Sequence, residues 1–403
     1  MKILHVVHAY PPSMGGSQWF IKNLSEQLVA QFGDEVTVFT TTALDTATFA
    51  GRDGQVVNAG VSVENGVTVR RFPFVRGWYR TRKLASGIAD LLHLPGWDTL
   101  RAFHQGPIIP NLANAVAASG ADIVMAMAFP LWHMFATQKG SEKAGIPLVF
   151  TGAIHPTDVW GYARPMIFDA IRRVDAYFAL TPFEKTFLVK RGISPEKITV
   201  TGSGITPPPD SFPAPGIIRQ RLHLAADAPV ILALGRQNPR KRFEFLLNAM
   251  PQIWHAVPNA RIVFAGAAAE STTVLKQFGD SRVLVLNDIS EEEKHALLAA
   301  CDVLVLPSTA ESFGIVFLEA WWHRKPVIGA NTGAVASLIT DGVDGLLFEP
   351  DDEESLTRAL VNILTQSAPT QKMGILGKQK VQENYTWAMI ARQVHSVYTH
   401  IRK

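Results

Sequence analysis

The sequence has a single cysteine among its 403 residues, so no disulfide can form within the chain. That residue, Cys301, lies in the apolar stretch of residues 298–303, which favours a plain core residue over a reactive nucleophile. A small disulfide-linked fold is therefore excluded, and the surroundings of the one thiol give no support to thiol chemistry.

Long apolar runs are missing as well. A membrane-spanning helix needs about 18 consecutive apolar residues, and the nearest candidate, residues 123–136, is broken by Pro130 and His133. The apolar stretch at the N-terminus is too short for a secretory signal, and prolines follow it where a cleavage site would need small residues. We therefore expect a cytoplasmic protein, and peripheral contact with the inner face of a membrane stays open.

A strong excess of charge is absent too, since the formal net charge is +3 and the isoelectric point is near 8.9. A dedicated nucleic-acid binder carries a stronger basic excess, so we expect no nucleic-acid partner. Hydrophobic residues make up 47% of the chain, which is enough for a globular core. A chain of 403 residues is too long for one ordinary core, which predicts two domains.

Short β-branched runs alternate with helical patterns along the chain, as in parallel sheets that helices cover on both faces. The first set of runs lies at residues 3–7, 36–39, 67–72, 123–126, 148–150, 177–179 and 198–200. The second set lies at residues 230–234, 262–265, 283–286, 303–306, 327–329 and 346–348. Residues 206–216, with five prolines, separate the two sets and are typical of a linker.

The predicted fold is therefore α/β, with two doubly wound, Rossmann-like domains that face each other across a cleft. We expect the first domain to span residues 1–205 and the second residues 206–385. Residues 386–403 are expected to form a C-terminal helix that packs back on the first domain.

The loop after the first predicted strand contains adjacent glycines, Gly15 and Gly16, just before a predicted helix. Ligands bind at this edge of parallel sheets, where helix N–H groups are free, and glycine lets the backbone approach them closely. The sequence lacks both GxGxxG and GxxxxGK[ST], so neither a dinucleotide fingerprint nor a P-loop is present. A simple tight turn stays open as the alternative.

A cationic loop follows the first strand of the second domain, with Arg236, Arg240, Lys241 and Arg242. A solvated charge run is the alternative, but four cations in a strand-to-helix loop suit a bound pyrophosphate. Glu311 and Glu319 follow a later strand, and Glu319 lies on an apolar helix where a carboxylate needs a partner such as a ribose hydroxyl. The free N–H groups near the start of that helix suit a phosphate.

Together these motifs resemble the family-4 retaining glycosyltransferases of the GT-B fold, also called glycosyltransferase group 1. The resemblance covers nearly the whole chain and is most specific over residues 303–348. It rests on the early Gly-Gly loop, on G-R-x4-K at Gly235, Arg236 and Lys241, and on P-S-x-x-E-x-F-G with Glu311-x7-Glu319.

The resemblance implies a role for each matching position. Arg236 and Lys241 would neutralise the donor diphosphate, Glu311 would contact the donor sugar, and Glu319 would bind the nucleotide ribose. His155 matches the active-site histidine near the sugar, although a lone histidine after a strand is otherwise more often structural. The remaining donor-binding positions implied are Gly16, Gly235, Phe313, Gly314, Ile315 and Val316. The first domain would take the acceptor and the second the nucleotide sugar.

The predicted function is retaining, metal-independent transfer of a hexose from a UDP- or GDP-linked sugar to a hydroxyl of a glycan, lipid or small molecule. The nucleotide sugar is a co-substrate, and we expect no cofactor. A sugar-nucleotide epimerase of the same fold and a non-catalytic sugar-nucleotide-binding subunit stay open as alternatives. Residues 71–83 carry five cations and four aromatics without an acid, which suits a membrane or acceptor surface; an ordinary loop with its aromatics tucked in is the alternative.

Overall fold

The structure is a computed structural model that describes residues 1–13, 15–51, 54–156, 158–209, 211–225 and 227–402. It divides into two compact units, one of Met1–Gly204 with Trp387–Lys403 and one of Ile205–Thr386. Each division lies one residue from the boundary that the sequence indicates. Asp210, inside the expected linker, lies outside the described residues.

The first unit is built on one sheet, for which the described residues supply eight strands in the order β3-β4-β2-β1-β5-β6-β7-β8. Every neighbouring pair is parallel except β3 and β4. The strands are β1 (Lys2–Val7), β2 (Glu35–Thr41), β3 (Gly60–Glu64), β4 (Val67–Phe72), β5 (Ile123–Met127), β6 (Leu148–Thr151), β7 (Ala176–Ala179) and β8 (Ile198–Val200).

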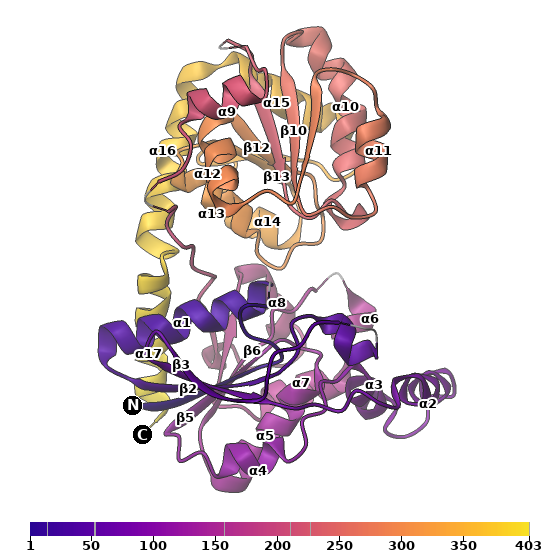
Figure 1. Ribbon diagram of the computed structural model, residues 1–403, viewed down its shortest axis with the longest axis vertical. Helices are drawn as coiled ribbons and strands as arrows, with labels where there is room; N and C mark the ends of the chain where they lie inside the picture. The colour runs from indigo at the N-terminus through magenta and orange to yellow at the C-terminus, as the bar shows by residue number, and fades with distance from the viewer. Residues whose placement is uncertain (14, 52–53, 157, 210, 226, 403) are drawn as a thin grey trace. The chain divides into compact units, whose positions relative to one another are not determined.

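Helices cover both faces of this sheet, and Figure 1 shows its strands between α1 on one side and α4 and α5 on the other. The helices are α1 (Gly16–Phe32), α2 (Tyr79–Leu91), α3 (Trp97–Gln105), α4 (Leu112–Ala117), α5 (Trp132–Ala144), α6 (Val159–Tyr162), α7 (Pro165–Arg172), α8 (Pro182–Val189) and α17 (Trp387–Ile401). Single 3-10 turns lie at Thr46–Ala50 and Pro195–Lys197.

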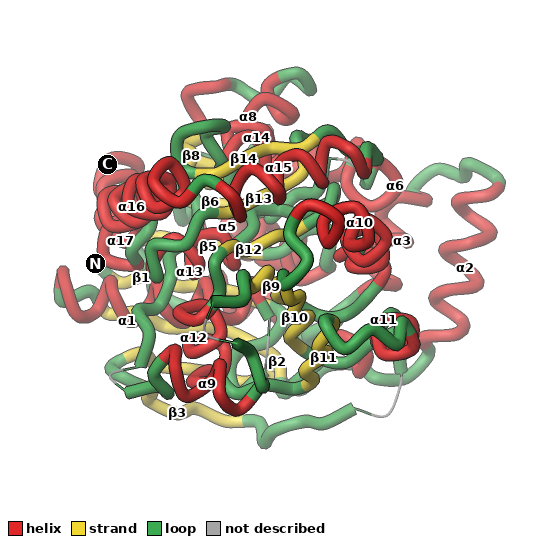
Figure 2. The backbone as a smooth tube through the Cα atoms, turned by 90° about the horizontal axis from the view of Figure 1, so that it is seen from above, coloured by secondary structure: helices red, strands yellow, loops and turns green. Residues whose placement is uncertain are grey.

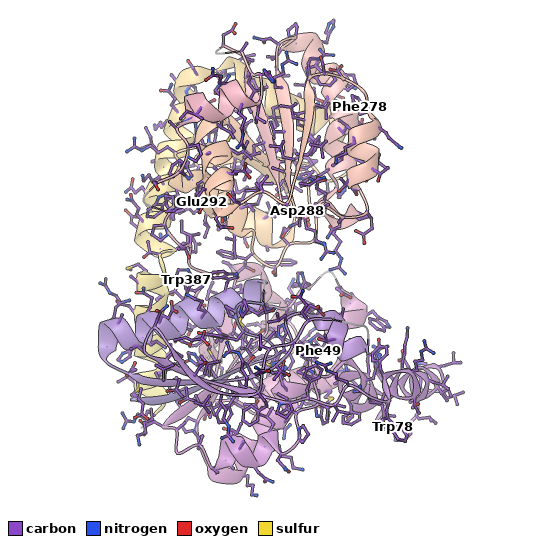
Figure 3. The ribbon with its side chains drawn as sticks, in the orientation of Figure 1. Phe49, Trp78, Phe278, Asp288, Glu292 and Trp387 are labelled. Carbon is purple, nitrogen blue, oxygen red and sulfur yellow. The ribbon has the colours of Figure 1, made fainter. Side chains whose placement is uncertain are left out.

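The C-terminal helix α17 packs against α1 within the first unit, and Trp387, labelled in Figure 3, lies at its start. The Trp387 ring meets Phe20 edge to face, with ring centroids 5.5 Å apart. Near the other end of α17, the buried Tyr398 hydroxyl lies 3.1 Å from His5 Nε2 on β1. The last helix therefore completes the core of the domain in which the chain begins.

The second unit contains a parallel sheet, and its described residues give the order β11-β10-β9-β12-β13-β14, which Figure 2 shows from above. The strands are β9 (Val230–Leu234), β10 (Arg261–Gly266), β11 (Val283–Asn287), β12 (Val303–Leu306), β13 (Val327–Ala330) and β14 (Gly345–Phe348). The helices are α9 (Pro215–Arg221), α10 (Phe243–Ala256), α11 (Thr272–Gln277), α12 (Glu291–Ala300), α13 (Ile315–Trp322), α14 (Gly333–Leu338), α15 (Glu353–Thr365) and α16 (Ser367–Asn384), with a 3-10 turn at Pro239–Lys241. The two doubly wound sheets confirm the expected α/β fold class.

Both sheets reverse their winding direction between two neighbouring strands, at β1 and β5 in the first unit and at β9 and β12 in the second. In open α/β sheets, ligands bind outside the carboxyl ends of strands at such a reversal. The Gly-Gly loop follows β1, and the cationic loop and the Glu311 loop follow β9 and β12. The topology therefore places these three sequence motifs at ligand-binding positions.

Among the described residues, none of the helices combines the length with the apolar character that crossing a bilayer requires.

Cys301 is buried at the end of α12, where its thiol donates to the carbonyl of Leu298 at 3.4 Å. Burial raises the pKa of this thiol to about 12, so it stays protonated. The burial of Cys301 and its protonated thiol both agree with a core residue.

Candidate functional site

The cationic loop of the second unit runs from Gly235, after β9, to Arg242, before α10. Gly235 has a φ of 147°, and a Cβ added there would lie 3.3 Å from Cε of Lys241. The Lys241 N–H donates to the carbonyl of Asn238 at 3.0 Å, and Arg242 takes a left-handed φ of 54° that turns the chain into α10. The loop thus folds back so that the Lys241 side chain crosses over Gly235.

Lys241 meets the second predicted motif directly, because its Nζ donates to Oε1 of Glu311 at 2.6 Å. Both side chains are largely buried, with 22% and 14% exposure. A buried ion pair costs desolvation of both ions and is stable only with close geometry. This contact joins the loops after β9 and β12 at the reversal point of the sheet.

The four cations of the loop differ in the partners that they have within the protein. Lys241 pairs with Glu311, and Arg242 pairs with Asp351. Arg236 and Arg240 are exposed and take part in no ion pair among the described residues. The charge left for an anionic ligand therefore centres on Arg236, Arg240 and the partly compensated Lys241.

Gly314 caps the N-terminus of α13 with a left-handed φ of 97°, and a Cβ there would lie 2.8 Å from the Phe317 ring. Glycine is therefore required by both the backbone and the packing. The first N–H groups of the helix, at Ile315 and Val316, have no carbonyl one turn earlier in the helix to bond. Phe313 is 3% exposed, with its ring 5.7 Å from that of Tyr385, so its ring belongs to the core.

Glu319, in the second turn of α13, pairs with Lys294 of α12 at 2.7 Å. Burial raises the pKa of Glu319, and Lys294 works against that shift by stabilising the carboxylate. Burial alone would lower the pKa of Lys294, but Glu319 and Glu291 outweigh it and raise the value. Lys294 thus offsets part of the desolvation cost of the buried Glu319 carboxylate.

Lys294 is a site residue that the sequence analysis missed. Lys294 directly follows the capping box of α12, in which Ser290 and Glu293 bond each other's backbone amides. That box fixes the start of α12, and the next residue then faces α13. A lysine four positions after the N-cap Ser290 carries no functional signature by itself, so only the packing of α12 on α13 reveals its contact with Glu319.

In the first unit, the Gly-Gly loop ends where α1 begins. Gln18 is buried, and its Nε2 donates to Oγ of Ser13 at 3.3 Å, while Ser13 donates to the Leu44 carbonyl at 2.6 Å. A Cβ added at Gly15 would lie 2.5 Å from Gln18 Oε1, whereas one added at Gly16 would meet no described atom within 4 Å. A side chain at position 15 would therefore displace the Gln18 amide, and Gly16 presents its backbone to open space.

His155 lies in the loop after β6, at the same sheet edge as Gly16. Its ring is half-buried, with its centroid 5.4 Å from that of Tyr162 in α6. The His155 carbonyl accepts from the Asp158 N–H at 3.0 Å. Gly16 and His155 belong to the first unit, and all the other predicted site residues belong to the second.

Two further histidines, His8 and His133, lie at the reversal point between β1 and β5. Both are buried, and their ring centroids are 5.9 Å apart. Burial lowers the pKa of His8 to about 4 and that of His133 to about 3, so both are neutral at physiological pH. His133 Nε2 lies 2.8 Å from the Met127 carbonyl, which makes this nitrogen the donor.

Among the described residues, no group of three or more His, Cys, Asp or Glu is arranged to hold a metal ion.

Solved structures share this architecture over the full chain. Sucrose-phosphate synthase from Thermosynechococcus elongatus matches with a TM-score of 0.73 and 19% identity, covering 100% of this chain and 99% of that chain. Anabaena Alr3699/HepE in complex with UDP-glucose matches with a TM-score of 0.70 and 20% identity, covering 99% and 100%. These likenesses define the fold as GT-B, with two Rossmann-like domains.

The family follows from the sequence matches. Residues 15–204 match the glycosyl transferase 4-like domain, and residues 228–366 match the glycosyl transferases group 1. The chain belongs to the group 1 glycosyltransferases. A curated relative, the phosphatidyl-myo-inositol mannosyltransferase of Propionibacterium freudenreichii subsp. shermanii, is 32% identical over 175 residues, which cover 42% of this chain and 43% of the relative. The chain spans about half the length of the first curated relatives it matches.

Proposed function

We propose that this protein transfers a hexose from a UDP- or GDP-linked sugar to an acceptor hydroxyl, with retention of the anomeric configuration. The observation that carries the proposal is the contact of Lys241 with Glu311, next to the exposed Arg236 at the reversal point of the second sheet. The HepE structure with UDP-glucose supports a nucleotide sugar as the donor.

The donor diphosphate would lie against Arg236 and Lys241. Negative charge grows on the diphosphate as the sugar leaves, and fixed cations stabilise that charge more in the transition state than in the ground state. The N–H groups of Gly314, Ile315 and Val316 add donors without side-chain bulk, and Gly235, without a Cβ, leaves room for the diphosphate beside them. These groups supply positive charge without a metal ion, so we expect transfer to need no divalent cation and no cofactor.

The nucleoside and the sugar would use the two carboxylates. Glu319, paired with Lys294, would accept hydrogen bonds from the ribose hydroxyls. Glu311 would contact the sugar hydroxyls and keep Lys241 oriented. Gly16 and His155 would keep the roles that the family resemblance implies, at the diphosphate and at the sugar, and the first unit would bind the acceptor, a glycan, lipid or small molecule.

We also propose that α2 binds an anionic phospholipid surface at the inner face of the membrane. Its face from Arg80 to Leu91 is a solvent-open groove, where Leu84 and Leu91 are 65% and 79% exposed and Arg80 and Lys83 flank them. Trp78, labelled in Figure 3, is 78% exposed just before the helix. Exposed apolar side chains with flanking cations are typical of helices that lie on anionic lipid.

Within residues 71–83, only the later part would belong to the proposed lipid surface. Arg71 pairs with Glu64 at 2.9 Å and donates to the Pro11 carbonyl, so it is engaged inside the unit. Phe72 and Phe74 pack against the core, as the ordinary-loop alternative expects. The proposed lipid surface would therefore begin at Trp78.

The donor is tested by thermal denaturation of the full chain with UDP-, GDP- and ADP-sugars, since a matched donor stabilises the fold by mass action. The stabilising donor is then incubated with acceptor hydroxyls, with and without EDTA, and the anomeric configuration of the product is read by NMR. Transfer with retention in EDTA is expected. An epimerised nucleotide sugar would support the epimerase, and binding without turnover would support the non-catalytic subunit.

A further inference from the structure

A buried carboxylate in the first unit bonds to the loop that carries His155. Glu184, in the first turn of α8, is 1% exposed. Its Oε1 accepts from the Tyr177 hydroxyl at 2.6 Å and from the Ile154 N–H at 3.2 Å. Its Oε2 accepts from the Leu180 N–H at 2.8 Å. One side chain thus connects β7, α8 and the loop after β6.

Tyr177 holds the same loop at a second point. Its hydroxyl accepts from the Gly152 N–H at 3.0 Å, and the side chain is fully buried. A Cβ added at Gly152 would lie only 2.2 Å from the Tyr177 oxygen, so a residue with a side chain would displace that oxygen. The hydroxyl therefore links Gly152 to Glu184 in one chain of hydrogen bonds.

The two bonded amides flank a residue in an unfavourable conformation. Ala153 has a φ of 48°, in the left-handed region that residues other than glycine rarely adopt. Such a conformation persists only where surrounding contacts hold it. Here the N–H of Gly152, before Ala153, donates to Tyr177, and the N–H of Ile154, after Ala153, donates to Glu184. His155 follows Ile154 directly.

Packing alone does not account for an ionisable group at this place. Burial raises the pKa of Glu184 to about 7, so the site disfavours the charged form, and an apolar side chain would avoid that cost. A carboxylate offers acceptor sites for three donors at once, which an apolar side chain cannot do. The cost of burying the Glu184 carboxylate is consistent with a requirement to fix the loop that carries His155.

We propose that Glu184 and Tyr177 are positioning residues for His155, which they hold at the donor sugar by clamping both sides of Ala153. The inference rests on the proposed function, because His155 is assigned to the sugar there. Both side chains are buried, so both act through the loop alone.

The test uses Tyr177→Phe in the full chain, with Tyr398→Phe as the matched control. Tyr398 is equally buried in the same unit, and its hydroxyl bonds His5 and not the loop. We expect Tyr177→Phe to lower kcat about tenfold with little change in donor KM, on the scale of a small misplacement of a catalytic group. The control should keep the kcat of the wild type.

A double-mutant cycle with His155→Ala separates positioning from general weakening of the fold. If Tyr177 acts through His155, Tyr177→Phe should change kcat less than about twofold once His155 is gone. An equal drop in both backgrounds, or a normal kcat in Tyr177→Phe, would overturn the proposal. Full activity of His155→Ala would overturn it as well.

Hydrogen exchange gives a readout that needs no turnover and also covers variants that fold poorly. The amides of Gly152 and Ile154 should exchange at least tenfold faster in Tyr177→Phe or Glu184→Gln, and should stay at the wild-type rate in Tyr398→Phe. Unchanged exchange in both loop variants would contradict the clamp. If the wild type transfers no sugar from any donor, the proposed function fails, and the exchange data still decide whether the clamp exists.

Discussion

At the scale of single residues, Arg236 and Lys241 should provide most of the electrostatic contribution to catalysis. Replacing either residue with alanine should lower kcat by about a hundredfold or more, the scale for one lost electrostatic donor in a transition state. Arg242→Ala is the matched control, because Arg242 lies in the same loop but is paired with Asp351. Steady-state kinetics with the matched donor decide the point, and near-normal turnover in both variants would remove the assignment.

Glu319 and its partner Lys294 lead to a second prediction, on nucleotide affinity. Glu319→Ala should weaken binding of the free nucleoside diphosphate by about 1–3 kcal/mol, since a hydrogen bond to a charged group is lost. The control is Glu291→Ala, because Glu291 also pairs with Lys294 but is 68% exposed, where an ion pair contributes little. Calorimetry that finds equal affinity in Glu319→Ala and in the wild type would make Glu319 a structural carboxylate.

The raised pKa of Glu184 predicts how stability depends on pH. Its pKa rises from 4.5 to about 7 on folding, so the fold favours the protonated form. That contribution is complete below pH 4.5 and is lost as the pH rises to about 7. The free energy of unfolding of the wild type, relative to Glu184→Gln, should fall by about 3 kcal/mol over this range, at about 1.4 kcal/mol per pKa unit. A difference that grows with pH in urea titrations would mean that the bonds from Tyr177, Leu180 and Ile154 outweigh burial.

At the scale of elements, the strand positions could be predicted and the pairing of side chains could not. The thirteen expected runs all lie in strands of the structure, because buried parallel strands are continuous β-branched runs. The missed strand is β3, an exposed edge strand that reaches β4 through Asn65 and Gly66, both with positive φ. Asn-Gly is a strong hairpin signal, and it was present in the sequence. The contact of Lys294 with Glu319 had no such signal, since it depends on how α12 packs on α13.

The helix α2 gives an element-scale prediction on lipid binding. Leu84→Glu should lower binding to vesicles of anionic phospholipid by about tenfold, because it places a negative charge in the apolar face and removes buried apolar area. Val61→Glu is the control, since Val61 on β3 is 65% exposed, the same as Leu84. Vesicle sedimentation measures both variants. Equal loss in the two variants, or no binding by the wild type, would remove α2 as a lipid surface.

At the scale of the whole molecule, the chain ends in the domain in which it begins. Trp387, Ile390, Val394 and Tyr398 of α17 are all buried in the first unit. Burying a large apolar side chain stabilises a fold by roughly 1.5–3 kcal/mol, so ending the chain at Tyr385 should cost the first unit about 5 kcal/mol or more. A domain has only about 5–15 kcal/mol of stability in total. The truncated chain should therefore lose the first unit and keep the second.

Limited proteolysis and calorimetry of the truncated chain test this dependence. Cleavage should spread through residues 1–204 while residues 205–385 stay protected, because the strands and helices of the second unit, β9 to β14 and α9 to α16, are complete without α17. A shorter truncation, after Tyr398, is the control, since it leaves the contacts of Trp387 with Phe20 and of Tyr398 with His5 in place. Protection of residues 1–204 in both truncations would show that α1 and its sheet need no cover from α17. Loss of both units together would instead mean that the second domain depends on the first for its own stability.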